Sequence, residues 1–487
     1  MDENNLIKER LKKLNELKEQ GINPYPHNTS FKKEDISKIK KKHADLKPET
    51  TTNDKRGVAG RIMLFRRMGK AAFITIRDDF DEIQLFFRQQ EVSNFDMLKY
   101  FDIGDFIGAQ GTVMTTKTGE LSIKVNNFEM LSKAIRPLGD KYKGIKDPEV
   151  KFRKRHLDLL QNEDSRETLR KRSLMMRLIR EYLNNKGYME VETPILHPIY
   201  GGAAAKPFKT YHNAIKSDLY LRISPELYLK RLIVGGFEKI YDINKNFRNE
   251  GVDSTHNPEF TMLELYHAYT DYEDMMKLTE ELYEYLALKI NGKTKTKFKG
   301  KTVDVKAPWK RITMLDAVKK YAGIDASKSS VEELEIFCKK NNVDIPEEKT
   351  WGNLVIEIFE GLCEDKFVNP TFVIDHPRES SPLCKSHRED PRLIERFEPF
   401  CMGVELANSF TELNDPIIQR ELLEDQARQL RAGDEEANPM DNDFVEAIEN
   451  GMPPTGGLGI GLDRTAMLLF GKDSIRDVIL FPALKEK

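Results

Sequence analysis

Five short runs of strand-forming residues lie between positions 58 and 131, and they constrain the fold of this chain more than any other feature. The runs read VAGRIMLF, FITIR, IQLFF, FIGAQGTVMT and LSIKV, and glycine or aspartate residues interrupt the chain between them. Five strands in so short a span are typical of a closed Greek-key barrel. We therefore expect residues 55–135 to form a β-barrel domain.

Barrels of this kind, the OB type, commonly bind single-stranded nucleic acid through exposed aromatic side chains, with basic side chains nearby. Phe73 and Gln84 suit such a strand face. Basic residues lie close to them in the sequence, at Arg61, Arg66, Arg67 and Lys70. A phenylalanine in a strand is more often part of the core, so both interpretations of Phe73 stay open at this point.

The first 54 residues are expected to form a basic helix followed by a connector. Ile7, Leu11 and Leu14 recur at helical spacing, and basic residues surround this stripe. Such a helix can pack on its own protein or contact RNA phosphates, and the pattern leaves both open. Residues 28–54 show no clear periodicity, which predicts a connector.

The overall charge does not identify a partner. The 78 basic and 80 acidic residues nearly cancel, so nucleic acid would have to meet a local basic patch. The four cysteines lack the close pairing of a structural zinc site. The charged N-terminal segment and the lack of a run of about 18 apolar residues predict a cytoplasmic protein without membrane contact.

The rest of the chain predicts an α+β domain. Residues 136–164, which include Pro148, are expected to form a linker. An amphipathic helix follows from about Ser165 and ends at Gly187. Short strands then alternate with helices, which indicates a domain at 165–487 built on a mainly antiparallel sheet flanked by helices.

The predicted strands of this domain and their edges carry many ionisable residues, namely Glu226, Arg248, Glu250, Glu264, Glu398, Glu405, Glu412 and Arg464. Each could serve a structural ion pair, but burying so many charges on one sheet is costly unless they meet a polar ligand. Carboxylates suit Mg²⁺ held together with phosphates, and arginines suit phosphate oxygens. The pattern therefore indicates a nucleoside triphosphate site, although the chain has no phosphate-loop motif.

Three segments, in order, resemble the signature motifs of the class II aminoacyl-tRNA synthetases. KGYMEVETPIL at 186–196 resembles motif 1, FRNEGVDSTHNPEF at 247–260 resembles motif 2, and GLGIGLDRTAM at 457–467 resembles motif 3. Other blocks, such as ELANSFTELNDP at 405–416, are similar to the lysyl-tRNA synthetases. The resemblance implies that L-lysine reacts with ATP to give lysyl-adenylate and pyrophosphate. Lysine would then be transferred to the 3′-terminal adenosine of lysine tRNA.

The same resemblance assigns residues to ATP and to Mg²⁺. Arg248 and Arg464 are the implied catalytic residues, because arginines offset charge that builds on the phosphates. The residues implied for ATP are Arg248, Glu250, His256, Asn257, Phe260, Glu398, Glu405 and Arg464, with Glu398 and Glu405 as ligands of Mg²⁺.

Lysine carries an ammonium group at both ends and therefore needs acidic partners at both. The resemblance implies that Glu226 receives the α-amino group, and that Glu412 and Tyr266 bind the ε-ammonium. The residues implied for lysine are Gly202, Glu226, Arg248, Glu264, Tyr266, Asn408, Phe410 and Glu412. A substrate with an acidic side chain, such as aspartate, would be repelled by the carboxylates of such a pocket.

Two macromolecular partners are also implied. In the barrel, Phe73 and Gln84 would bind the central U of the anticodon, Arg61 would hold adjacent phosphates, and Glu120 would contact another base. Motif 1, centred on Pro194, would form the interface of a homodimer.

Three other functions fit parts of this pattern. An aspartate or asparagine enzyme would share the barrel, but the pocket acids oppose it. A truncated paralogue that lysylates a protein would lack the barrel. A catalytically silent regulatory protein should have lost a motif arginine or a metal carboxylate, and Arg248, Arg464, Glu398 and Glu405 are all present.

Overall fold

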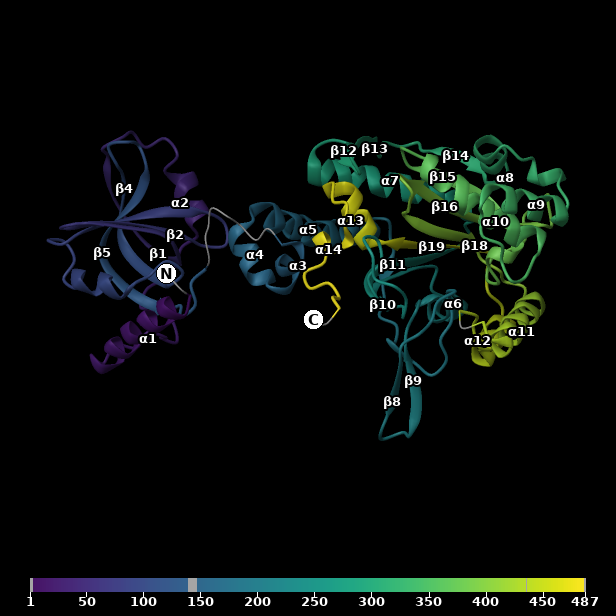
Figure 1. Cartoon of the computed structure of the whole chain (residues 1–487), viewed down its shortest axis with the longest axis horizontal. Coiled ribbons are helices and arrows are strands. Elements are labelled where there is room, and N and C mark those ends of the chain that lie inside the picture. Colours follow the sequence, from purple (N-terminus) through teal and green to yellow (C-terminus); the bar gives the residue numbers. More distant parts are fainter. Residues whose placement is uncertain (1–2, 139–146, 435, 486–487) are drawn as a thin grey trace. The chain divides into compact units, whose positions relative to one another are not determined.

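The computed structural model describes residues 3–138, 147–434 and 436–485. They belong to two compact units, Met1–Gly144 and Ile145–Lys487 (Figure 1). Residues 139–146 of the predicted linker lie outside the described residues. None of the described helices combines the length and the apolar composition that a membrane span requires.

The first unit contains a closed barrel of five strands among its described residues, as the strand runs predicted. In barrel order the strands are β1 (Thr51–Met68), β2 (Ala71–Arg77), β3 (Glu82–Arg88), β5 (Leu121–Ser132) and β4 (Phe106–Thr115). Successive side chains of a strand point to opposite faces, and this decides which of them fill the barrel. Ile74 and Ile76 are buried inside, whereas Phe73 and Thr75 lie on the half-buried outer face.

Among the described residues of this unit, three helices accompany the barrel: α1 (Glu3–Glu19), α2 (Ile36–Lys42) and η1 (Phe95–Tyr100). The segment 28–54, predicted as a connector, therefore contains helix α2 and the start of β1.

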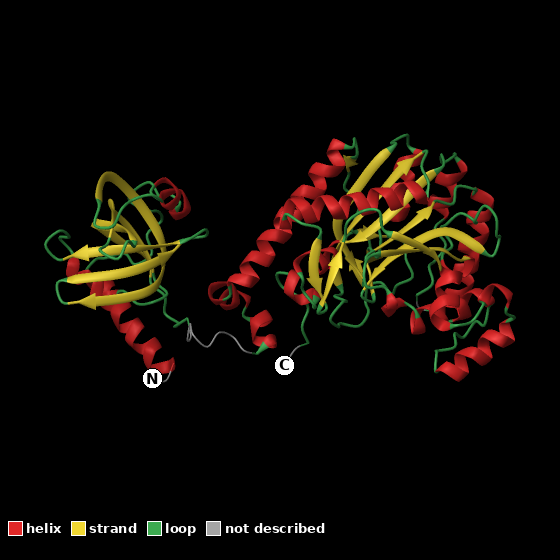
Figure 2. Ribbon diagram, turned by 90° about the horizontal axis from the view of Figure 1, so that it is seen from above, coloured by secondary structure: helices red, strands yellow, loops and turns green. Residues whose placement is uncertain are grey.

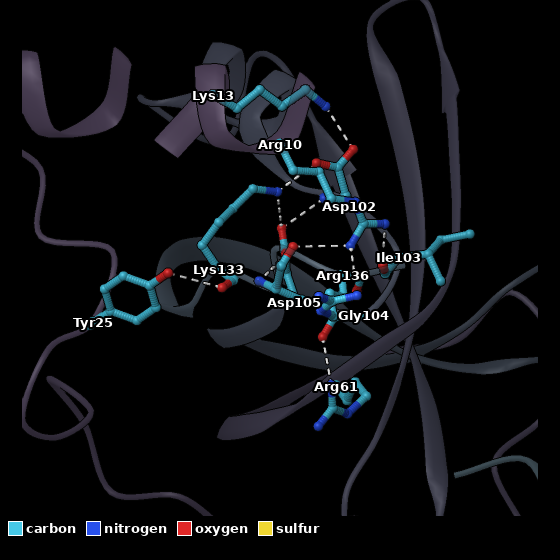
Figure 3. A network of polar contacts seen from close by, with 11 residues as sticks. Arg10, Lys13, Tyr25, Arg61, Asp102, Ile103, Gly104, Asp105, Lys133 and Arg136 are labelled. Carbon is cyan, nitrogen blue, oxygen red and sulfur yellow. Dashed lines mark hydrogen bonds and ion pairs between the residues drawn. The ribbon is translucent and has the colours of Figure 1, made fainter. Parts of the chain in front are cut away.

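Helix α1 buries a face that differs from the predicted one. The prediction placed Ile7, Leu11 and Leu14 inward, but the buried residues are Arg10, Leu14 and Leu17, and Leu11 is 39% exposed. The prediction was wrong because it assigned arginine to solvent. Arg10 is buried because its guanidinium donates hydrogen bonds to backbone carbonyls of the barrel unit (Figure 3).

Those carbonyls belong to Ile103, Ala134 and Arg136, at distances of 2.9, 3.0 and 3.3 Å from the Arg10 nitrogens. Lys13 on the same helix donates to Asp102 at 2.6 Å. Helix α1 thus packs on its own barrel, which is one of the two interpretations that the sequence left open.

The second unit is built on a sheet of nine strands among its described residues. In sheet order they are β14 (Lys310–Thr313), β15 (Thr371–Pro377), β16 (Leu393–Cys401), β18 (Ala407–Thr411), β19 (Thr455–Gly461), β11 (Glu259–Ala268), β10 (Lys239–Phe247) and β6 (Met189–Glu190), with β17 (Val404–Glu405) paired to β16. The pairs β14–β15 and β10–β6 are parallel and the others are antiparallel. This confirms the prediction of an α+β domain on a mainly antiparallel sheet.

Among the described residues of this unit, the remaining strands form two smaller sheets. One contains β7 (Leu196–His197), β9 (Ser217–Leu221) and β8 (Lys209–His212), and the other contains β12 (Lys295–Phe298) and β13 (Lys301–Asp304). The helices are α3 (Pro148–Arg153), α4 (Arg155–Gln161), α5 (Glu163–Asn185), α6 (Glu226–Val234), α7 (Tyr272–Asn291), α8 (Met314–Ala317), α9 (Val331–Asn341), α10 (Trp351–Leu362), α11 (Pro416–Ala432), α12 (Asn442–Glu449), α13 (Leu462–Phe470) and α14 (Ile475–Val478). Short turns of helix are η2 (Val318–Ala322), η3 (Ala326–Lys328), η4 (Glu364–Lys366) and η5 (Arg378–Ser380). Within the predicted linker, α3 and α4 occupy most of residues 148–161.

Helices cover both faces of the main sheet (Figure 2). Leu263 and Leu265 of β11 belong to a large core shared with α5, α7 and α13. The alternate residue Tyr266 belongs to a smaller core shared with α6 and α12. Because neighbouring side chains of a strand point to opposite faces, β11 separates an apolar layer from the face that carries the polar residues described next.

Candidate active site

A cavity of about 430 Å³ lies over strands β11, β18 and β19. Every residue that the sequence predicted for ATP or lysine lines it. These residues come from α6, the motif 2 segment, strands β11, β16, β17 and β18, the start of α13, and two positions outside these elements, Gly202 and Glu412. The structure thus brings together side chains that are up to 262 residues apart, from Gly202 to Arg464.

Strand alternation and register explain how the sheet presents this site. Glu264 and Tyr266 point to the cavity face of β11, two residues apart. Glu264 lies opposite Gly459 of β19, and Tyr266 lies opposite Gly457. Neighbouring side chains take the room that these glycines leave, Glu412 at Gly457 and Met262 at Gly459.

Two positions that line the cavity require glycine, because side-chain atoms of other residues approach them closely. A Cβ atom on Gly457 would lie 1.8 Å from Oε1 of Glu412, so this position admits the Glu412 carboxylate only as glycine. Gly202 has a φ of +87°, and a Cβ there would lie 3.0 Å from the Cβ of Glu226. Both glycines therefore shape the end of the cavity that holds the acids.

Three buried carboxylates meet at this end, those of Glu226, Glu264 and Glu412. The Ser224 hydroxyl donates to Glu264 at 3.0 Å and accepts the backbone N–H of Glu226 at 3.1 Å. Burial, and then the charge of Glu226, raise the pKa of Glu264 to about 8. Burial also raises the pKa of Glu412 to about 8, against the lowering effect of a neighbouring ammonium. Carboxylates gathered in this way favour a cationic ligand.

That ammonium belongs to Lys230, which the sequence analysis missed. Its side chain is fully buried, its Nζ donates to Glu226 at 2.7 Å, and it forms an ion pair with Glu412. Burial opposes its charge, but Glu226 and Glu412 raise the pKa of Lys230 above its usual value. The signal was present, because Glu226 and Lys230 are four residues apart on helix α6. Glu412, predicted to serve the substrate, thus already has a partner within the chain.

The residues predicted for phosphates line the same cavity. Arg464 donates to Glu405 at 3.0 Å, and its second terminal nitrogen lies 3.1 Å from Nε2 of His256. The Arg248 guanidinium lies 5.2 Å from the centre of the Phe260 ring. These cationic side chains line the same cavity as the acids and can face an anionic ligand.

The motif 2 loop is tied to the C-terminal segment. Asn257 is buried, and its amide accepts the backbone N–H of Ala483 at 3.0 Å and donates to the Glu259 carbonyl at 2.5 Å. Glu250 lies exposed on the rim of the cavity. Asn257 therefore positions the loop backbone, whereas its predicted contact with phosphates stays a prediction.

The two carboxylates predicted for Mg²⁺ both line the cavity, and Glu398 is paired with Arg396 on its own strand. In the part of the chain that the structure describes, no group of three or more metal-binding side chains occurs. A cation here would need phosphate oxygens as further ligands, which is how Mg²⁺ commonly binds nucleotides. Burial and the charges of Glu360, Glu398 and Glu405 raise the pKa of Glu364 to about 7, so the surroundings fit a cation.

In the barrel, Phe73 stacks on Phe86 of the next strand, with ring centroids 4.9 Å apart. Gln84 lies on the same face, opposite Thr75, and its amide oxygen accepts a hydrogen bond from Ser122 at 3.1 Å. Phe86 was missed, although it alternates with Gln84 along β3. Phe73 is half-buried and Phe86 is buried at 9% exposure, so the Phe73 ring is the one suited to stacking on a base.

Arg61 is held close to the barrel. Its guanidinium donates to the Gly104 carbonyl at 2.9 Å and lies 4.2 Å over the Phe106 ring. Burial lowers its pKa from the usual arginine value. Glu120 lies exposed before β5, and both predicted contacts with RNA stay predictions.

The motif 1 segment presents apolar surface. Pro194 is exposed, and the next two residues, Ile195 and Leu196, are 37% and 45% exposed. An apolar run of this kind is suited to an interface, although the predicted dimer stays a prediction.

Comparison with known proteins agrees with both units. The family model of tRNA synthetases class II (D, K and N) matches residues 147–485, and an OB-fold nucleic acid binding domain matches residues 58–131. A lysine–tRNA ligase of Clostridium novyi (strain NT) is 49% identical over 99% of this chain and 95% of its own length. A lysine–tRNA ligase of Thermoanaerobacter sp. (strain X514) is 48% identical over 99% of this chain and 97% of its own length. The fold class and the family that the motifs predicted are thereby confirmed, and the chain belongs to the class II tRNA synthetases, in the family of the lysine–tRNA ligases.

Proposed function

We propose that this chain activates L-lysine with ATP and transfers the lysyl group to the 3′-terminal adenosine of lysine tRNA. One observation carries the choice of amino acid: Glu226, Glu264 and Glu412 are buried together in the cavity that also holds Arg248 and Arg464. A dication with a carboxylate matches a cavity that is lined by both acids and arginines. Family membership supplies the reaction class.

In the first step, a carboxylate oxygen of lysine attacks the α-phosphorus of ATP, and the bond to the bridging oxygen of pyrophosphate breaks. Arg248 would hold the lysine carboxylate and the α-phosphate together, which supplies proximity and offsets charge. Arg464 would contact the leaving phosphates from the opposite side. Mg²⁺, held by Glu398 and Glu405 with phosphate oxygens, would supply further positive charge. No protein nucleophile is required.

Lysine would be selected by its two ammonium groups. Glu226 and the backbone near Gly202 would receive the α-amino group, and Glu412 and Tyr266 would receive the ε-ammonium. Glu264, Asn408 and Phe410 would complete the pocket, which they line. An uncharged analogue would leave buried carboxylates without a partner, and this costs affinity.

The barrel would bind the anticodon of lysine tRNA. The stacked rings of Phe73 and Phe86, with the amide of Gln84 on the same face, support a site for an unstacked base. Arg61 would contact phosphates next to it, and Glu120 would contact another base.

A homodimer would form through motif 1. The exposed apolar residues Pro194, Ile195 and Leu196 support this part of the proposal. Solution scattering should give the mass of a dimer, and a monomeric mass at micromolar concentration would contradict it.

The amino acid is tested by ATP–pyrophosphate exchange with each of the twenty amino acids. We expect exchange with L-lysine and none with L-aspartate or L-asparagine. Exchange with aspartate but not with lysine would end the assignment. Charging of lysine tRNA, measured with radioactive lysine, tests the second step separately.

A further inference from the structure

The lysine pocket contains more acidic side chains than basic ones. Glu226, Glu264 and Glu412 supply three carboxylates, and Lys230 supplies one ammonium within ion-pair distance of two of them. All four side chains are at least nine-tenths buried. Buried charges are tolerated only when they are balanced, so two negative charges remain for a ligand or for protons to balance.

We propose that Lys230 sets the number of positive charges that the pocket accepts, by balancing one of its three carboxylates so that two remain for the two ammonium groups of one lysine. The inference rests on the proposed function and deepens it. Lys230 is a positioning residue in this scheme, since it acts on the substrate through Glu226 and Glu412.

The other ionisable groups around these carboxylates do not change the count. Arg222 is paired with Asp242 at 3.0 Å, and Arg248, whose charge lowers the pKa of Glu264, is assigned to the substrate carboxylate. Tyr266 and Cys384 also face the acids, and burial, followed by nearby carboxylates, raises the pKa of both well above their usual values. Both groups are therefore neutral at pH 7, and the balance depends on the three acids and Lys230.

A measurable consequence is the release of protons. Without lysine, Glu264 and Glu412 have raised pKa values near 8 and hold protons at neutral pH. When two ammonium groups enter, the carboxylates ionise and the protons leave. Lysine binding should therefore release protons at pH 7, and lysine should bind more tightly as the pH rises toward 8.

The geometry around Lys230 also argues against a role in packing alone. The i to i+4 spacing on α6 holds its Nζ at 2.7 Å from Glu226, while the ion pair with Glu412 reaches from α6 to the residue that follows β18. A methionine could fill the same space and would remove only the charge. Charge and volume can therefore be separated by substitution.

The test counts protons in three variants of the full chain. Isothermal titration of lysine is carried out in two buffers with different ionisation enthalpies, and the difference gives the protons released. Glu226→Gln should release about one proton fewer than the unsubstituted chain, because one carboxylate that can hold a proton is lost, and Lys230→Met about the same number, because two ammonium groups can balance only two of its three carboxylates. The double variant should return to the original number.

Kinetics give a second readout. The KM for lysine in ATP–pyrophosphate exchange should rise by about tenfold or more in Lys230→Met at pH 7, because one carboxylate of the pocket then lacks its ammonium partner. The KM for ATP should stay unchanged. Lys133→Met provides a matched control, since Lys133 is an equally buried lysine in the barrel and its loss should leave the proton count for lysine unchanged.

Equal proton counts in Glu226→Gln and the double variant would overturn the inference and leave Lys230 a packing residue. Should Lys230→Met fail to fold, by circular dichroism, Glu226→Gln still decides, and an unchanged count there overturns the inference. Failure of the proposed function would look different, because the unsubstituted chain would then not exchange with lysine at all.

Discussion

The barrel and the catalytic unit each bury a lysine between two carboxylates, and only one of these arrangements is balanced. In the barrel, Lys133 donates to Asp105 at 2.8 Å and to Asp102 at 2.5 Å (Figure 3). Lys13 donates to Asp102 from helix α1, and the backbone N–H of Ala134 donates to Asp105 at 2.7 Å. The charges of Asp102 and Asp105 are thus balanced by Lys13 and Lys133, which belong to the same unit.

In the catalytic unit, one lysine faces three carboxylates and a cavity. The pKa values show the contrast: despite burial, Lys13 and Lys133 lower the pKa of Asp102, whereas burial and a neighbouring acid raise that of Glu264. A balanced buried network holds structure together, and an unbalanced one indicates a ligand. The functional site is distinguished by its excess of buried carboxylates over buried ammonium groups, and not by the mere presence of buried charges.

The largest effect should come from breaking the balanced network. Lys133→Met leaves Asp105 buried without its ammonium, which should destabilise the barrel by about 3–5 kcal/mol. Hydrogen exchange of the full chain should show faster exchange in the barrel strands and unchanged protection in α7 and β11. Unchanged protection of the barrel strands would mean that the Lys133 network does not stabilise the barrel, which would contradict its contrast with the Lys230 network.

Glu412→Gln should keep the fold and weaken lysine activation by roughly 2–5 kcal/mol, the cost of removing one partner of a buried charge pair. ATP–pyrophosphate exchange gives this value from kcat/KM for lysine. The thermal midpoint of unfolding serves as the control and should change little. Equal exchange kinetics in the variant and the unsubstituted chain would remove Glu412 from the lysine pocket.

Phe73→Ala tests the barrel as a binding surface. The loss of one stacking ring should weaken charging of lysine tRNA by about 1–3 kcal/mol and spare adenylate formation. The two steps are measured separately, by charging and by pyrophosphate exchange. A parallel loss in both assays would indicate a structural role for the ring and argue against base contact.

The smallest effect concerns pH. Glu264 has a pKa of about 8 in the lysine-free chain, so it is mostly protonated at pH 6 and 7 and must ionise to pair with an ammonium. The ionisation of Glu264 alone should therefore increase lysine affinity by up to about tenfold, or 1.4 kcal/mol, for each pH unit from 6 to 8, and this contribution should level off above the pKa. Titration calorimetry across this range gives the slope, and a flat profile would show that the carboxylates are already ionised without lysine.

Much of the fold was predictable because its signals are local. Alternating runs predicted the barrel strands, and the motifs predicted which residues gather around one cavity. Burial of Arg10 was not predictable, because the carbonyls that hold it come from segments more than ninety residues away. Phe86 and Lys230 were within reach of local rules, since each lies at strand or helix spacing from a residue that was recognised.

The sequence by itself determined the family, the reaction class and the set of polar residues around the cavity, since residue identity and order carry that information. Only the tertiary structure decided how those charges balance. Pairing Glu412 with Lys230 requires the segment after β18 to lie beside α6, and the room for that carboxylate requires Gly457 on a third element. Such contacts depend on sheet register and helix packing between distant segments, which no local pattern specifies.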